Sequence, residues 1–143
     1  MSFVARLRDE LESRMTGLFG TGSIPVTSRG QQIDQKYLPL GFAWIESDTV
    51  TQRADSGDDS GRLVEYHDVV FQVGVITKNN ARFSTMDAAV ATIRSRMQPD
   101  FEGFDFRLIS TDYEEEIRTF GRPFVAAVLN FTVTFTTPEG DAG

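Results

Sequence analysis

Apolar residues near the start of the chain recur at steps of three and four positions. They are Phe3, Val4, Leu7, Leu11, Met15 and Leu18. Charged residues fill most of the positions between them, so the pattern predicts an amphipathic helix over residues 2–18. Ser2 is the expected N-cap, and Gly17 and Gly20 are expected to end the helix.

A second helical stripe lies in the middle of the chain. It consists of Met86, Ala89, Val90, Ile93 and Met97. Ser84 is the expected N-cap of this helix, with Asp87 at the capping-box position, and Pro99 limits its continuation.

Two longer stretches alternate between apolar and polar residues, as strands do. The apolar positions are Val69, Phe71, Val73 and Val75 within 62–77, and Val125, Ala127, Leu129, Phe131, Val133 and Phe135 within 125–136. A short apolar run at 42–45 leads into a polar stretch, and we interpret 41–77 as one long hairpin with a polar distal half. Phe104, Phe106 and Leu108 predict a further strand, followed over 111–121 by a second projecting hairpin tip.

The expected order of elements is therefore α-β-β-α-β-β. It predicts an α+β fold with an antiparallel or mixed sheet, both helices on one face and long projecting hairpins. We expect a single domain over 1–143, with a flexible acidic hairpin tip at 53–61 and a C-terminal tail at 138–143. The glycine- and serine-rich segment 20–37 lacks periodicity, and such long irregular segments usually serve function or are ordered by a partner.

Composition narrows the class of protein. The 143 residues have a formal net charge of −7 and no cysteine. The acidic balance argues against a binder of nucleic-acid backbones or of anionic lipid, and the missing cysteines exclude disulfides and thiolate metal sites. No stretch resembles a signal peptide or a membrane span, so we expect synthesis in the cytoplasm.

No catalytic constellation emerges from the residues, so we expect neither an enzyme nor a cofactor or metal. His67, the only histidine, is followed by Asp68, but neighbouring strand residues point to opposite faces and cannot easily cooperate. The acidic stretch from Asp55 fails the calcium-loop pattern at its third, sixth and twelfth positions. Glu114, Glu115 and Glu116 could hold a metal with Asp112, but a charge run of this kind more often forms a solvated tip.

The chain as a whole resembles the tail terminator proteins of long-tailed bacteriophages, also called minor tail protein U-like or tail completion proteins. The resemblance rests on the first helix, the segment Ile24 to Arg29, Leu38-Pro39 leading a strand into Glu46-Ser47, the strand at 69–77, the helix at 84–97, the segment Leu108 to Asp112, and the closing strand Ala126 to Phe135. It covers most of the chain, and none of these segments is a catalytic signature.

The resemblance implies a structural virion protein of the tail or neck. Such proteins form a ring, typically a hexamer, on the end of the tail tube. The ring stops tube polymerisation and joins the tail to head-completion proteins, while DNA passes through its lumen without specific binding.

Charge suggests how such subunits could meet. Residues 44–68 carry seven acids against two arginines, and residues 100–116 carry seven acids against one. Acidic projections of one subunit could pair with arginine-bearing faces of the next, or line the lumen and repel DNA. The candidate inter-subunit or lumen contacts are Asp55, Asp58, Asp59, Glu114, Glu115, Glu116, Arg118 and Arg122.

Two alternatives stay open. The chain could be another ring component of a phage neck or tail, such as a head-completion or tube protein. It could also be a cone-shaped α+β ligand-binding or isomerase domain, which would need a buried carboxylate or tyrosine among its core-facing positions.

Overall fold

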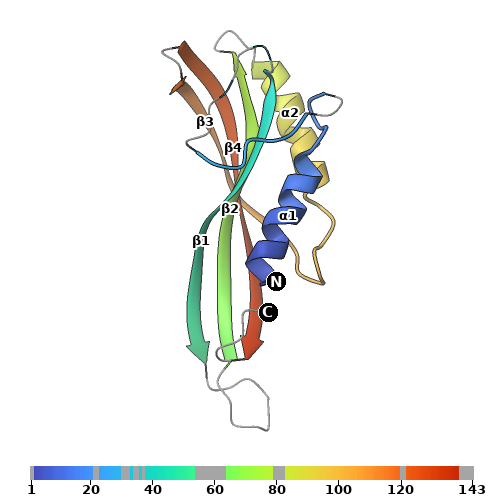
Figure 1. The fold of residues 1–143 in the computed structure, drawn as a ribbon, viewed down its shortest axis with the longest axis vertical. Coiled ribbons are helices and arrows are strands. Elements are labelled where there is room, and N and C mark those ends of the chain that lie inside the picture. Colours follow the sequence, from blue (N-terminus) through green and yellow to red (C-terminus); the bar gives the residue numbers. More distant parts are fainter. Residues whose placement is uncertain are drawn as a thin grey trace.

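The protein folds as two helices on one side of a four-stranded sheet (Figure 1). The computed structural model describes residues 2–20, 23–29, 33, 36, 38–53, 64–78, 83–119 and 122–138; at 52, 53, 78, 83–85, 115–119, 122–124 and 138 it describes the backbone alone. The elements are α1 (Phe3–Met15), β1 (Leu40–Arg53), β2 (Val64–Lys78), α2 (Phe83–Arg96), β3 (Arg107–Thr119) and β4 (Arg122–Pro138). The strands pair antiparallel in the order β1-β2-β4-β3. The predicted α+β class and element order are confirmed.

Helix α1 forms where its apolar stripe predicts it. The Ser2 side chain accepts a hydrogen bond from the Ala5 amide (3.2 Å), which satisfies one of the free donors at the helix start. Phe3, Leu7, Leu11 and Met15 are all buried. The helix ends at Met15, three residues before its predicted end, because Gly17 adopts a φ of +74° just beyond the C-cap.

The predicted long hairpin is confirmed as β1 and β2. Its register runs from Leu40 opposite Ile76 to Arg53 opposite Val64, with a bulge between Ile45 and Ser47. Figure 1 shows β1, β2 and β4 continuing past the N-terminal end of α1, so the last part of this hairpin, beyond the level where Phe3 stacks on Phe135, has no helix over it.

Helix α2 also matches its predicted stripe, with Met86, Val90, Ile93 and Met97 buried. It begins at Phe83, one residue before the expected N-cap Ser84. Ser84 therefore lies inside the first turn and is not the residue that precedes the helix.

The predicted strand around residues 104–108 is wrong in its start. Phe101 and Phe104 instead close a turn by exchanging two backbone hydrogen bonds of 2.9 Å. Glu102 and Gly103 inside it have φ of +52° and +85°, which a strand cannot accommodate. Strand β3 begins at Arg107 and runs to Thr119, so most of the predicted tip at 111–121 is strand.

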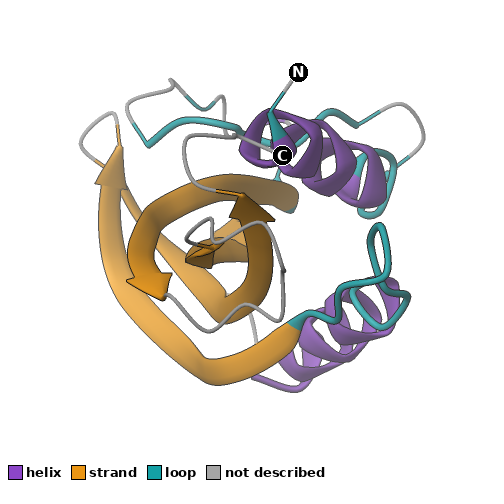
Figure 2. Cartoon of the chain, turned by 90° about the horizontal axis from the view of Figure 1, so that it is seen from below, coloured by secondary structure: helices purple, strands orange, loops and turns teal. Residues whose placement is uncertain are grey.

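The main core lies between the helices and one face of the sheet. The sheet contributes alternate residues of its two central strands: Val69, Phe71, Val73 and Val75 from β2, and Ala127, Leu129, Phe131 and Val133 from β4. Each large side chain buried here stabilises the fold by about 1.5–3 kcal/mol. Figure 2 shows the sheet strongly curled, with both helices outside the curl. We call the opposite face, which carries neither helix, the helix-free face.

Candidate functional site

A chain of hydrogen bonds crosses the helix-free face from one edge strand to the other. The Gln72 side-chain oxygen accepts from the Trp44 indole (2.8 Å), and the Gln72 amide donates to the Asn130 oxygen (2.8 Å). Asn130 in turn donates to the Ser110 hydroxyl (3.1 Å) and to the Asp112 carboxylate (2.8 Å). The register makes this possible because Gln72 lies between Trp44 and Asn130 across three adjacent strands. Every donor meets an acceptor, so this polar ladder links all four strands.

The segment 23–29 continues the face beyond β1. Val26 accepts a backbone hydrogen bond from Ala43 and donates one to Gly41, each 2.9 Å, in a parallel bridge to β1. Three residues on, the Arg29 guanidinium donates to the Gln72 oxygen (2.9 Å) and forms an ion pair with Glu46. The segment is thus fixed at Val26 through its backbone and at Arg29 through its side chain.

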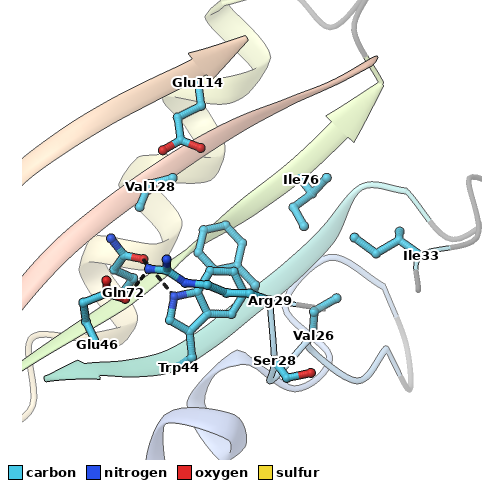
Figure 3. A pocket seen from close by; sticks show the side chains of 11 residues that line it. Val26, Ser28, Arg29, Ile33, Trp44, Glu46, Gln72, Ile76, Glu114 and Val128 are labelled. Carbon is cyan, nitrogen blue, oxygen red and sulfur yellow. Dashed lines mark hydrogen bonds and ion pairs between the residues drawn. The ribbon is translucent and has the colours of Figure 1, made fainter. Parts of the chain in front are cut away.

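Between this segment and the sheet lies a hollow of about 470 Å³ (Figure 3). Its base is apolar and is formed by Val26, Ile33, Phe42, Trp44, Ile76 and Val128. The Phe42 and Trp44 rings stack with centroids 4.5 Å apart, and the Arg29 guanidinium stands 5.5 Å from the Trp44 ring centroid.

The rim of the hollow is charged on two sides. Arg29 and Glu46 stand on one side, and Glu114 of the opposite edge strand β3 stands on the other (Figure 3). Arg29 and Glu46 compensate each other, whereas Glu114 forms no ion pair within the described part of the chain. The hollow therefore combines an apolar base with an excess of one negative charge.

The exposed apolar side chains lie along the two edges of the sheet. Among the described residues, four large apolar side chains are exposed: Ile24 (66%), Val50 (48%), Ile109 (56%) and Tyr113 (44%). Val50 lies on β1 and Ile24 on the segment beside it, whereas Ile109 and Tyr113 lie on β3. No described strand pairs with the outer side of β3, or with β1 beyond Ala43.

The prediction that His67 and Asp68 point to opposite faces is confirmed. His67 is buried on the helix side, stacked on Phe135 at 4.5 Å, and Asp68 is exposed. The carboxylates near His67 belong to Asp48 (3.2 Å) and Glu65 (3.3 Å) instead. This cluster is remote from the hollow in the register, since Val50 of β1 faces His67 while Trp44 faces Gln72.

Of the predicted contact residues, the structure places Glu114 in the hollow. Asp55, Asp58 and Asp59 lie outside the described residues. The side chains of Glu115, Glu116, Arg118 and Arg122 also lie outside the description, although their backbone belongs to β3 and β4. The expectation that the glutamate triplet forms a hairpin tip is wrong, because β3 continues to Thr119 before the chain turns.

Sequence reasoning missed Arg29, Gln72 and Asn130. A signal for two of them was available, because Gln72 and Asn130 each place an amide side chain in the middle of one of the two long alternating stretches. Within the described chain, no group of three or more metal-ligating side chains is close enough to hold an ion, and no helix is long and apolar enough to cross a bilayer.

Comparison with known proteins gives little. No protein-family model and no curated protein matches the chain. Among solved structures, the chain is similar to a chain from the virion of a native gene transfer agent particle. The alignment spans 92% of this chain and 97% of the other, with a TM-score of 0.45 and 17% sequence identity. A likeness at this level carries no argument about function.

Proposed function

We propose that this chain is a structural subunit of a phage-like particle that assembles head to tail into a ring on the end of a tail tube, as a tail terminator. The ring, typically of six copies, stops tube polymerisation and presents a surface to head-completion proteins, and DNA passes through its channel. The role as terminator rests on the family resemblance of the sequence. The proposed assembly into a ring rests on the two edge strands of the sheet, β1 and β3.

The observation that carries the assembly step is the division of exposed apolar residues between opposite edges of one sheet. Ile24 and Val50 lie at the β1 edge, and Ile109 and Tyr113 lie at the β3 edge. A long, unpaired, partly apolar edge strand is a template for pairing with another chain. Because the two edges differ, joining one to the other is a heterologous contact, and such contacts close into rings when the rotation permits.

The first test is the mass of the purified protein by light scattering and native mass spectrometry across concentration. Subunits of 16.0 kDa are expected to form a closed oligomer near six copies, alone or on mixing with tail-tube protein, and imaging should then show it on tube ends. Val50→Lys and Ile109→Lys should each prevent assembly by placing a charge on one edge. Ser13→Lys, on the exposed side of α1, is the matched control and should assemble normally.

A protein that stays monomeric or dimeric at every concentration and ignores tube protein would contradict the ring. It would favour the ligand-binding alternative, because the hollow has the size of a small-molecule pocket. Against that alternative, the described core contains no buried carboxylate or tyrosine: its buried polar residues are His67, Thr77, Thr132 and Thr137.

A further inference from the structure

The residues that line the hollow on the helix-free face indicate which kind of ligand or protein segment would bind there. Its base is built from six apolar residues, two of them stacked aromatic rings. Across from the Arg29–Glu46 pair, Glu114 stands on the rim without an ion-pair partner in the described chain. A complementary occupant therefore carries apolar side chains together with a cation that reaches Glu114.

The chain itself contains a segment of this chemistry at the end of the β3–β4 hairpin. Residues 117–124 read Ile-Arg-Thr-Phe-Gly-Arg-Pro-Phe, with two arginines, no acid and three large apolar residues. The hairpin end is narrow, since Thr119 pairs with Arg122 across a two-residue connection. It also projects, because the pairing of β2 with β4 stops at Phe124 while β3 and β4 continue to pair beyond it.

We propose that the hollow of one copy receives the β3–β4 hairpin end of a second copy, with a guanidinium of Arg118 or Arg122 paired to Glu114 and the apolar side chains on the Phe42–Trp44 base. This inference rests on the proposed ring and names a contact within it. Each copy offers this hollow once and the β3–β4 hairpin end once, so a head-to-tail ring in which the two meet fills every such hollow and leaves no β3–β4 hairpin end free. That match favours a second copy over a different basic protein.

Charge reversal tests the pairing directly. Glu114→Arg gives a copy whose hollow rim and hairpin end are both positive, and Arg118→Glu with Arg122→Glu gives a copy in which both are negative. Each variant alone is expected to associate at least about 100-fold more weakly than the parent, because like charges meet in every contact. Glu114→Gln, which removes the charge without reversing it, should weaken association by about 10-fold. An equimolar mixture of the two reversed variants should regain the parent's association, since each hairpin end then meets a hollow of opposite charge.

Asp9→Arg is the matched control, because it makes the same charge change on an exposed position of α1. Association is measured by sedimentation and native mass spectrometry, and circular dichroism verifies that each variant is folded. If the parent itself never associates, the ring fails and this contact with it. If the parent forms a ring and the Glu114 and arginine variants behave like Asp9→Arg, the ring stands and the contact is overturned.

Two further outcomes would also overturn the contact. In one, both reversed variants lose association but their mixture does not regain it, which would mean that the hairpin end is not the occupant. In the other, Glu114→Arg leaves self-association intact and abolishes binding to tail-tube protein, which would assign the hollow to that protein.

Discussion

Gly74 offers the sharpest test of how the sheet is packed beneath the hollow. It lies in the middle of β2, opposite Phe42 on one side and Val128 on the other. A Cβ atom placed there would stand 2.0 Å from the Ala127 carbonyl oxygen and 2.6 Å from the Phe42 ring. Glycine weakens the interior of a strand and often marks a place where another group approaches closely, and here two groups do.

The expected effect of Gly74→Ala follows from two opposing contributions. Alanine stiffens the unfolded chain, which favours folding by about 0.4–1 kcal/mol. Overpacking a core opposes it by about 1–3 kcal/mol, and the upper end applies here because the Ala127 contact involves backbone that must move with β4. We expect a net loss of about 2 kcal/mol in the free energy of unfolding, which for a domain of this size lowers Tm by about 4–8 °C.

Thermal and urea denaturation followed by circular dichroism, at one fixed protomer concentration, measure this loss. Gly20→Ala is the control, because Gly20 is exposed and a Cβ there would meet no atom within 4 Å. It should change the free energy of unfolding by less than about 0.5 kcal/mol, or stabilise slightly. If Gly74→Ala unfolds at the same midpoint as Gly20→Ala, the close approach of β4 and Phe42 to β2 is refuted.

Two more predictions concern the polar ladder and Tyr113 on the edge strand β3. Asn130→Ala removes the link between Gln72 and Asp112 and should cost about 1–2 kcal/mol of stability by urea denaturation, and an unchanged midpoint would contradict the ladder. The pKa of Tyr113 is raised above its ordinary value of 10.0, first by lost hydration and then by its hydrogen bond to the Asp87 carboxylate. A group whose pKa is raised in the folded state contributes its full stabilisation below the unfolded pKa and loses it as the pH rises through the folded pKa, so stability should fall as the pH rises through the Tyr113 pKa. A difference titration against Tyr113→Phe should show that pKa, and Asp87→Asn should lower it; a midpoint unmoved by Asp87→Asn would exclude the hydrogen bond.

The sequence predicts most of the fold because each element buries one regular face. The stripe from Phe3 to Met15 and the alternation from Val125 to Phe135 are set by burial against a single core, and burial is what periodicity reports. The start of β3 could not be predicted in this way, because Phe104 and Phe106 alternate like strand residues while Glu102 and Gly103 impose a turn through their positive φ.

The candidate site could not be predicted in the same manner, because it depends on strand order. Gln72 and Asn130 lie 58 residues apart and meet only because β4 lies beside β2. Arg29 comes from a segment without periodicity and reaches the ladder through the bridge of Val26 to β1. Glu114 was expected at a hairpin tip, and it joins the hollow because β3 continues through it as an edge strand.

The position of the hollow explains why one assembly contact is expected at this end of the molecule, in addition to those along the sheet edges. An antiparallel sheet can leave one face exposed to water when that face is polar. On the C-terminal half of β4, the helix-free face is polar because it carries exposed hydroxyl-bearing residues such as Thr134 and Thr136. At the other end, the same face is apolar around Phe42 and Trp44, and leaving this apolar surface exposed to water is unfavourable. The segment 23–29 lies at that end because Val26 bridges to Phe42. The Glu114 rim and the β3–β4 hairpin end lie there too, because Ala126 pairs with both Ile76 and Glu114 and follows the hairpin turn by only a few residues. A second copy that covers the hollow would therefore bury apolar surface and pair the Glu114 charge in the same contact, while the core beneath the helices is left unchanged.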